Sequence, residues 1–182
     1  VFFEEHAKFA VDAGIAMHDN LLELTKHWQT QGNKWPIMAQ KMKMRIGLNS
    51  GEMVTGNMGS KHHMNYTMMG DVVNIAARLE SSAKQYGIFF HSTEDTLVVA
   101  GSENYIWRYI DRVQFVGKTV WYQTIEILGH KDKINDKQNK LIHHFHKGLD
   151  YYYEQDWNNA LKEFIKSNNF ETNNGIKDIK NQ

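Results

Sequence analysis

Two hydrogen-bond donors lie one helical turn apart near the middle of the sequence. Asn74 and Arg78 are four residues apart, and the apolar residues around them recur at helical spacing, so both side chains are expected on one helix face. An amide can hold a sugar and a guanidinium can bind a phosphate, so this pair of donors suits chemistry at a phosphate. The spacing alone also fits a surface ion pair at Arg78 and a turn cap at Asn74.

The helix that carries this pair has recognisable ends in the sequence. Gly70-Asp71 is a helix-start signal and Gly87 a stop signal, so the spacing predicts a helix over residues 72–86. Residues 64–69 alternate in the manner of a strand that leads into it.

A hairpin is predicted before that strand. Residues 42–48 alternate with period two, and residues 52–56 follow the turn residues Asn49-Ser50-Gly51. Two such runs around a turn predict that they pair with each other.

The remaining elements mix helices and strands without strict alternation. A long amphipathic helix is expected over residues 4–29, and a closing hairpin over 105–116 and 120–128. Between them we expect a short buried strand at 88–90 and a helix at 93–100. The pattern predicts the α+β class, a sheet with helices packed on it.

The block from Arg45 to Glu80 resembles the catalytic domain of class III adenylyl and guanylyl cyclases. In that family a strand of the form Arg-hydrophobic-Gly-hydrophobic-x-x-Gly precedes a glycine-punctuated hairpin, a Tyr-x-x-x-Gly strand end and a helix beginning x-x-Val-Asn-x-Ala-x-Arg. This chain reads Arg-Ile-Gly-Leu-Asn-Ser-Gly from Arg45 and Tyr-Thr-Met-Met-Gly-Asp-Val-Val-Asn-Ile-Ala-Ala-Arg from Tyr66. The resemblance extends over residues 4–128 and implies a ferredoxin-like cyclase sheet that is incomplete at its N-terminus.

The resemblance implies a role for three of these residues. Asn74 would fix the ribose and Arg78 would bind the phosphate of the nucleotide. Thr67 occupies the position that selects the base, commonly Asp or Thr in adenylyl cyclases and Cys in guanylyl cyclases. A hydroxyl can accept a hydrogen bond from the adenine amino group, so ATP is favoured over GTP as substrate. Thr67 also fits a residue chosen only because it favours strands.

Two basic residues are candidates for contact with the triphosphate. Arg45 matches a family position implicated in polyphosphate contact, although an arginine on a strand equally fits a solvated charge. Lys118 stands in Val116-Gly117-Lys118, where many relatives read Lys-Gly-Lys. Val116 replaces the first lysine of that triplet, so Lys118 is a possible substitute for it.

The resemblance also implies a metal cofactor and a second protomer. Class III cyclases bind two Mg²⁺ or Mn²⁺ ions through a pair of aspartates that lie upstream of the first helix of this chain. Asp12, Asp19 and Asp71 do not match those motifs, so the metal ligands are expected outside this chain. The family works as a head-to-tail dimer, in which one protomer gives the metal aspartates and the other gives the Asn and the Arg. This chain alone is therefore expected to be inactive.

A second element follows the cyclase-like block. Residues 130–140 are polar and charged, which predicts a linker between a partial cyclase domain at 1–129 and a helical tail at 141–182. The tail resembles a single tetratricopeptide repeat, a helix-turn-helix that cannot bury its own apolar face and so calls for a protein partner. The residues at the repeat positions are Gly148, Tyr151, Ala160, Phe164 and Ser167.

Composition narrows the class of protein. The 182 residues carry a formal net charge of +0 and no cysteine, so nothing indicates binding to nucleic acid or to an anionic membrane, and a cytoplasmic location is expected. No stretch is apolar over the length of a membrane span. The sequence therefore favours part of an adenylyl cyclase that makes cyclic AMP and pyrophosphate. The alternative is a non-catalytic cyclase-like module for dimerisation or nucleotide binding, with a protein-binding tail.

Overall fold

The computed structural model describes residues 5–171, which form two compact units. Within the described residues, the first unit holds residues 5–102 with Ile110–Glu126, and the second holds Glu103–Tyr109 with residues 127–171. The expected helix start at Glu4 and the end of the tail, 172–182, lie outside the described residues. Among residues 5–171, no helix combines the length and the apolar composition that a membrane span requires.

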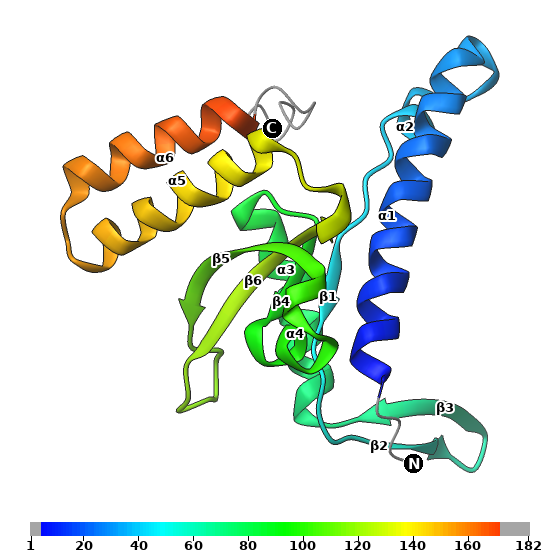
Figure 1. The fold of residues 1–182 in the computed structure, drawn as a ribbon. Helices are drawn as coiled ribbons and strands as arrows, with labels where there is room; N and C mark the ends of the chain where they lie inside the picture. The colour runs from blue at the N-terminus through cyan, green and yellow to red at the C-terminus, as the bar shows by residue number, and fades with distance from the viewer. Residues whose placement is uncertain (1–4, 172–182) are drawn as a thin grey trace. The chain divides into compact units, whose positions relative to one another are not determined.

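Helices and strands alternate irregularly along the chain, as expected for the α+β class (Figure 1). Three 3-10 turns, η1 (Gly32–Lys34), η2 (Ser102–Asn104) and η3 (Lys131–Lys133), connect the larger elements. These elements are α1 (His6–Thr30), α2 (Ile37–Gln40), β1 (Ile46–Leu48), β2 (Val54–Ser60), β3 (His63–Met69), α3 (Asp71–Tyr86), β4 (Phe90–Thr93), α4 (Glu94–Ala100), β5 (Tyr105–Val113), β6 (Tyr122–His130), α5 (Asp136–Tyr153) and α6 (Trp157–Glu171).

The strands form a mixed four-stranded sheet and a separate two-stranded ribbon. The sheet has the order β1-β4-β6-β5, with β1 parallel to β4 and β4 antiparallel to β6. The ribbon pairs β2 with β3. The predicted hairpin of 42–48 with 52–56 is therefore wrong: β1 pairs with a strand more than 40 residues later, and the hairpin runs from Val54 to Met69.

Helices cover both faces of β4, because successive residues of a strand point to opposite faces. Phe90 faces α1, where a Cβ added to Gly14 would lie 2.5 Å from its ring. His91 faces α3 and contacts the carbonyl oxygen of Leu79. The side of the sheet that carries His91 is therefore the side that positions α3.

The predicted helix 72–86 is confirmed, with its first residue at Asp71. Gly87 ends it in the left-handed conformation, with φ 68°, and donates its backbone N–H to the last turn. The N–H of Ile88 reaches the carbonyl oxygen of Ala83 at 3.0 Å, which satisfies a carbonyl that the helix end would otherwise leave unpaired.

The second unit contains a C-terminal pair of helices, α5 and α6, which run side by side in opposite directions (Figure 1). Asn135 and Gln138 form a reciprocal capping box at the start of α5. Asp136 to Lys140, expected in the linker, form the first turn of this helix. The helices approach closely at Gly148, where an added Cβ would lie 2.7 Å from the ring of Phe164.

A polar cluster also joins α5 to α6. The buried Glu163 carboxylate lies 2.7 Å from Nδ1 of His144 and 2.7 Å from Nζ of Lys166. Lys166 and His144 lower the pKa of Glu163 from its ordinary value of 4.5 to about 2. The carboxylate therefore stays ionised in the helix pair at neutral pH.

Candidate active site

Helix α3 is fixed against β1 by a residue without a side chain. A Cβ added to Gly47 would lie 2.2 Å from the carbonyl oxygen of Ala76 and 2.4 Å from the backbone nitrogen of Glu80. Only glycine allows the helix backbone to approach the strand this closely. The contact fixes the height of α3 above the sheet, and with it the positions of Asn74 and Arg78.

Asn74 and Arg78 lie one turn apart on α3, as the sequence predicts. The Asn74 side chain is exposed, and among the described residues it makes no hydrogen bond. The half-buried Arg78 donates from Nη1 to the backbone carbonyl oxygen of Val116 at 2.6 Å. A main-chain oxygen of the β5–β6 turn therefore holds Arg78 among the described residues, in place of the surface carboxylate that the alternative interpretation assigns to it.

Lys118 comes from the same turn and reaches the same helix. Its ammonium is paired with the carboxylate of Asp71, at the first position of α3. The Lys118 side chain is 25% exposed and that of Asp71 53%. The turn between β5 and β6 therefore contacts α3 at both Asp71 and Arg78, two helical turns apart.

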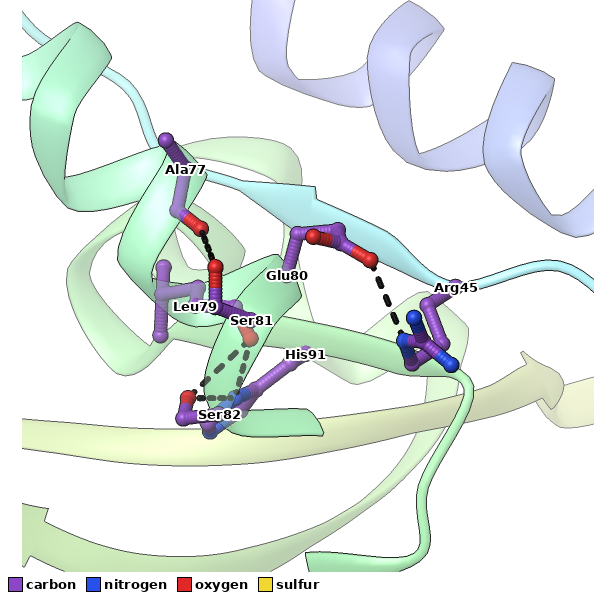
Figure 2. A network of polar contacts seen from close by, with 7 residues as sticks. All are labelled: Arg45, Ala77, Leu79, Glu80, Ser81, Ser82 and His91. Atoms are coloured by element: carbon purple, nitrogen blue, oxygen red, sulfur yellow. Dashed lines mark hydrogen bonds and ion pairs between the residues drawn. The ribbon is translucent and has the colours of Figure 1, made fainter. Parts of the chain in front are cut away.

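Arg45 does not join this group in the described structure. Its Nε donates to Oε1 of Glu80 at 3.1 Å, and both side chains are 43% exposed. Figure 2 shows the two side chains pointing toward each other across β1 and α3. This arrangement fits a solvated ion pair, and a role in polyphosphate contact stays a prediction.

Thr67 lies on the exposed ribbon, in register with Gly56 of β2. All seven residues of β3 are exposed. A Cβ added to Gly56 would meet nothing within 4 Å, so the surface beside Thr67 is open.

The segment after β1 anchors three elements instead of turning a hairpin. Asn49 donates to the carbonyl oxygen of Val72 at 3.2 Å and accepts from Thr93 at 2.9 Å. The backbone N–H of Ser50 donates to the buried Thr96 hydroxyl at 2.8 Å. A Cβ added to the adjacent Gly51 would lie 2.4 Å from Cγ1 of Val72. The segment Asn49-Ser50-Gly51 therefore fixes the start of α3 through its contacts with Val72.

A buried histidine supports the other half of α3. His91 is fully buried, and its Nδ1 lies 3.0 Å from the carbonyl oxygen of Leu79 and 3.1 Å from Oγ of Ser82 (Figure 2). Because a carbonyl only accepts, Nδ1 carries the proton. Nε2 is buried without a partner in the described part of the chain. Burial lowers the pKa of His91 below its ordinary value, so the ring stays neutral at neutral pH.

The described residues do not fit the divalent metal that class III cyclases use. No group of three His, Cys, Asp or Glu side chains among them is placed to hold a metal ion. Asp71, the acidic residue on the face of Asn74 and Arg78, is paired with Lys118.

Two participants in this site are not apparent from the motifs alone. The carbonyl oxygen of Val116 holds Arg78, and no sequence signal marks a backbone acceptor. Asp71 holds Lys118, and its position does carry a signal. Asp71 lies three residues before Asn74 and seven before Arg78, a spacing that places all three on one helix face.

Comparison with known proteins defines the family. A family model described as the adenylate and guanylate cyclase catalytic domain matches residues 3–128. The chain therefore belongs to the adenylate and guanylate cyclase catalytic domain family.

Individual relatives include both kinds of cyclase. The chain is 27% identical over 122 residues to the terminal-differentiation-specific adenylate cyclase of Dictyostelium discoideum, a match that covers 65% of this chain and 6% of that protein. It is 38% identical over 90 residues to guanylate cyclase 2G of Mus musculus, covering 49% of this chain and 8% of that protein. The chain thus spans a small part of these relatives.

A solved structure shows the same fold. The adenylyl cyclase CyaB from P. aeruginosa is similar with a TM-score of 0.56 and 25% identity, over 71% of this chain and 62% of that one. The predicted α+β cyclase sheet with a C-terminal helix pair is confirmed.

Proposed function

We propose that this chain supplies the nucleotide-holding half of an adenylyl cyclase site, in which ATP is converted to cyclic AMP and pyrophosphate. One observation carries the proposal. In a chain of this family, Asn74 and Arg78 lie one turn apart on a helix whose height is fixed by main-chain contact with Gly47. Positioning of this kind is what an in-line attack within one substrate requires.

The reaction joins the ribose 3′ oxygen to the α-phosphorus and breaks the bond from that phosphorus to the oxygen that leaves with pyrophosphate. The exposed Asn74 amide is free to hold the ribose. Arg78 donates one hydrogen bond to Val116 and keeps further guanidinium donors for phosphoryl oxygens. Donors held in place stabilise the negative charge that develops in the transition state.

Thr67 is proposed to select adenine. The open surface beside it, opposite Gly56, leaves room for a base. In competition between ATP and GTP, the reconstituted enzyme should make cyclic AMP faster. Replacing Thr67 by Cys, the residue common at this position in guanylyl cyclases, should reduce that preference. Faster cyclisation of GTP by the unchanged chain would contradict the assignment.

The complete site is proposed to form between two protomers arranged head to tail. The partner protomer would bring the carboxylates that hold Mg²⁺ or Mn²⁺, because the described residues of this chain do not form such a set. Each chain would then contribute what the other requires.

Complementation tests this proposal. This chain is mixed with a cyclase protomer that keeps its metal carboxylates but has alanine at its own positions matching Asn74 and Arg78. The mixture should make cyclic AMP, whereas neither component alone should. Asn74→Ala or Arg78→Ala in this chain should lower kcat by about 10²- to 10³-fold.

A basic residue elsewhere on α3 provides the matched control. Lys84 is exposed near the end of the helix, and Lys84→Ala should leave kcat unchanged. Near-normal turnover after Asn74→Ala and Arg78→Ala would remove both residues from the mechanism and favour the non-catalytic module.

We also propose that the helix pair is a tetratricopeptide-like repeat that binds a protein partner. Gly148 and the buried Ala160 are small residues of the helix pair, and Ser167 donates to the carbonyl oxygen of Leu141 at 2.9 Å. Leu161 and Ile165 remain exposed on one face of α6. Replacing both by serine should leave reconstituted cyclase activity unchanged; a loss of activity would assign the helix pair to the cyclase site instead.

A further inference from the structure

The β5–β6 turn packs against α3. The N–H of Lys118 donates to the carbonyl oxygen of Phe115 at 2.9 Å, and Gly117 has φ +80°, which together define a tight turn with glycine at its left-handed position. Phe115 is buried against Ile75 and Leu79 of α3. The tip of the turn, residues 116–118, therefore lies over the helix face that carries the candidate site.

The two contacts of this tip differ in how much of each basic side chain remains available to bind an anionic ligand. Arg78 gives one donor to Val116, and the rest of its guanidinium can still bind phosphate. Lys118 has a single compact charge, and that charge is neutralised by Asp71. An anion that binds Lys118 must compete with the Asp71 carboxylate and is repelled by it.

We propose that Asp71 is an internal counter-ion for Lys118 that the polyphosphate chain of the nucleotide displaces. Without nucleotide, Asp71 holds the tip of the turn on α3. When the polyphosphate binds, Lys118 exchanges one oxygen anion for another and the tip leaves Asp71. The ligand class follows from the proposed function, but the exchange itself requires only a polyanion.

Binding of inorganic tripolyphosphate to the whole chain, measured by titration calorimetry, tests the exchange without catalysis. Asp71→Asn should tighten binding about three- to tenfold, because it removes the competing charge. Lys118→Met should weaken binding. Asp95→Asn, which removes an exposed carboxylate from the first turn of α4, should leave the affinity unchanged.

The double variant Asp71→Asn with Lys118→Met decides whether Asp71 acts through Lys118. The gain from Asp71→Asn should disappear when Lys118 is absent. The same gain in both backgrounds would show a general charge effect and overturn the proposal, as would unchanged or weaker binding by Asp71→Asn, or no binding by the unchanged chain. Asp71→Ser also removes the charge and should tighten binding in the same way. Circular dichroism of both variants verifies that loss of Asp71 from the first turn of α3 has not unfolded the helix.

Hydrogen exchange of residues 114–121 gives a second readout. Tripolyphosphate should speed exchange in the turn of the unchanged chain, and Asp71→Asn should exchange rapidly without ligand. Equal exchange in all cases would contradict release of the tip. If complementation makes cyclic AMP but Asp71→Asn does not change tripolyphosphate binding, the counter-ion role is rejected and the cyclase assignment is kept. If complementation makes no cyclic AMP but Asp71→Asn tightens tripolyphosphate binding through Lys118, the counter-ion role is kept and the cyclase assignment is rejected.

Discussion

Helix α3 and the β2–β3 ribbon both carry residues assigned to the nucleotide, yet the chain holds them in different ways. Helix α3 buries Ile75, Leu79 and Ala83 and is fixed against β1 at Gly47. The ribbon has no buried residue, and Tyr66 at its centre is 74% exposed. The phosphate side of the proposed site is therefore built into the core, whereas the base side lies on an isolated two-stranded element.

This difference separates two tasks. In-line attack on phosphorus tolerates little misplacement, so its donors belong on an element held by burial. A two-stranded hairpin is only marginally stable in water by itself. We therefore expect contact with another element, such as a second protomer in the proposed dimer, to stabilise the ribbon.

The largest expected contrast is between a core residue of α3 and an exposed residue of the ribbon. Leu79 is 0% exposed, whereas Met68 is 54% exposed. Leu79→Ala should lower the free energy of unfolding by about 2–5 kcal/mol through the cavity it leaves, whereas Met68→Ala should change it by less than about 0.5 kcal/mol. Urea unfolding followed by circular dichroism measures both. Equal losses would show that the ribbon is as tightly packed as the helix.

Two glycines give a matched pair of smaller effects. Gly47→Ala places a methyl group against the backbone of Ala76 and Glu80, whereas Gly56→Ala places one in open space. The first should cost about 1–3 kcal/mol of unfolding free energy and also reduce complementation, because α3 must shift. The second should be nearly neutral in both assays. Full complementation by Gly47→Ala would mean that the height of α3 is not critical.

The pH dependence of unfolding sharpens the comparison further. Burial lowers the pKa of His91 from its ordinary value of 6.5, so the stability gained from its neutral form is present above pH 6.5 and declines as the unfolded chain takes up a proton. His91→Gln should cost about 1 kcal/mol at pH 7.5 through the lost hydrogen bond to Leu79. This cost should shrink as the pH falls toward 5. Burial also lowers the pKa of His18, so the His91→Gln variant should retain part of the pH dependence of unfolding that the wild-type chain shows. If His91→Gln costs the same unfolding free energy at every pH, the assignment of the dependence to His91 is wrong.

The smallest effect is expected at the exposed pair of Arg45 and Glu80. Both side chains are 43% exposed, so Arg45→Ala should change the unfolding free energy by about 0–1 kcal/mol. If the pair is only a surface ion pair, the KM for ATP in the complementation assay should also stay unchanged. A marked rise in KM would place Arg45 at the polyphosphate after all.

The sequence predicts α3 well because its signals are local. Residues within a few turns of one another set the helix start at Gly70-Asp71 and the stop at Gly87. The same short range places Asn74 and Arg78 on one helix face. Strand pairing depends on distant residues. The alternation around Asn49 indicates a strand and a turn but does not name the partner of β1, which lies more than 40 residues later in β4.

The contacts of the site residues were harder to predict for the same reason. Lys118 contacts Asp71, which lies 47 residues away in the sequence. Arg78 contacts Val116, which lies 38 residues away. A motif reports which residue types are present, and it does not report which backbone oxygen will face them.

The two glycines of the β1 motif differ in their neighbours, and this difference has a genetic consequence. A methyl group at Gly51 meets the side chain of Val72, but one at Gly47 meets main-chain atoms of Ala76 and Glu80. A substitution at Gly51 can therefore be suppressed by a second mutation that shortens Val72. No codon change on α3 removes a backbone atom, so we expect no single substitution on that helix to make room for a methyl group at Gly47.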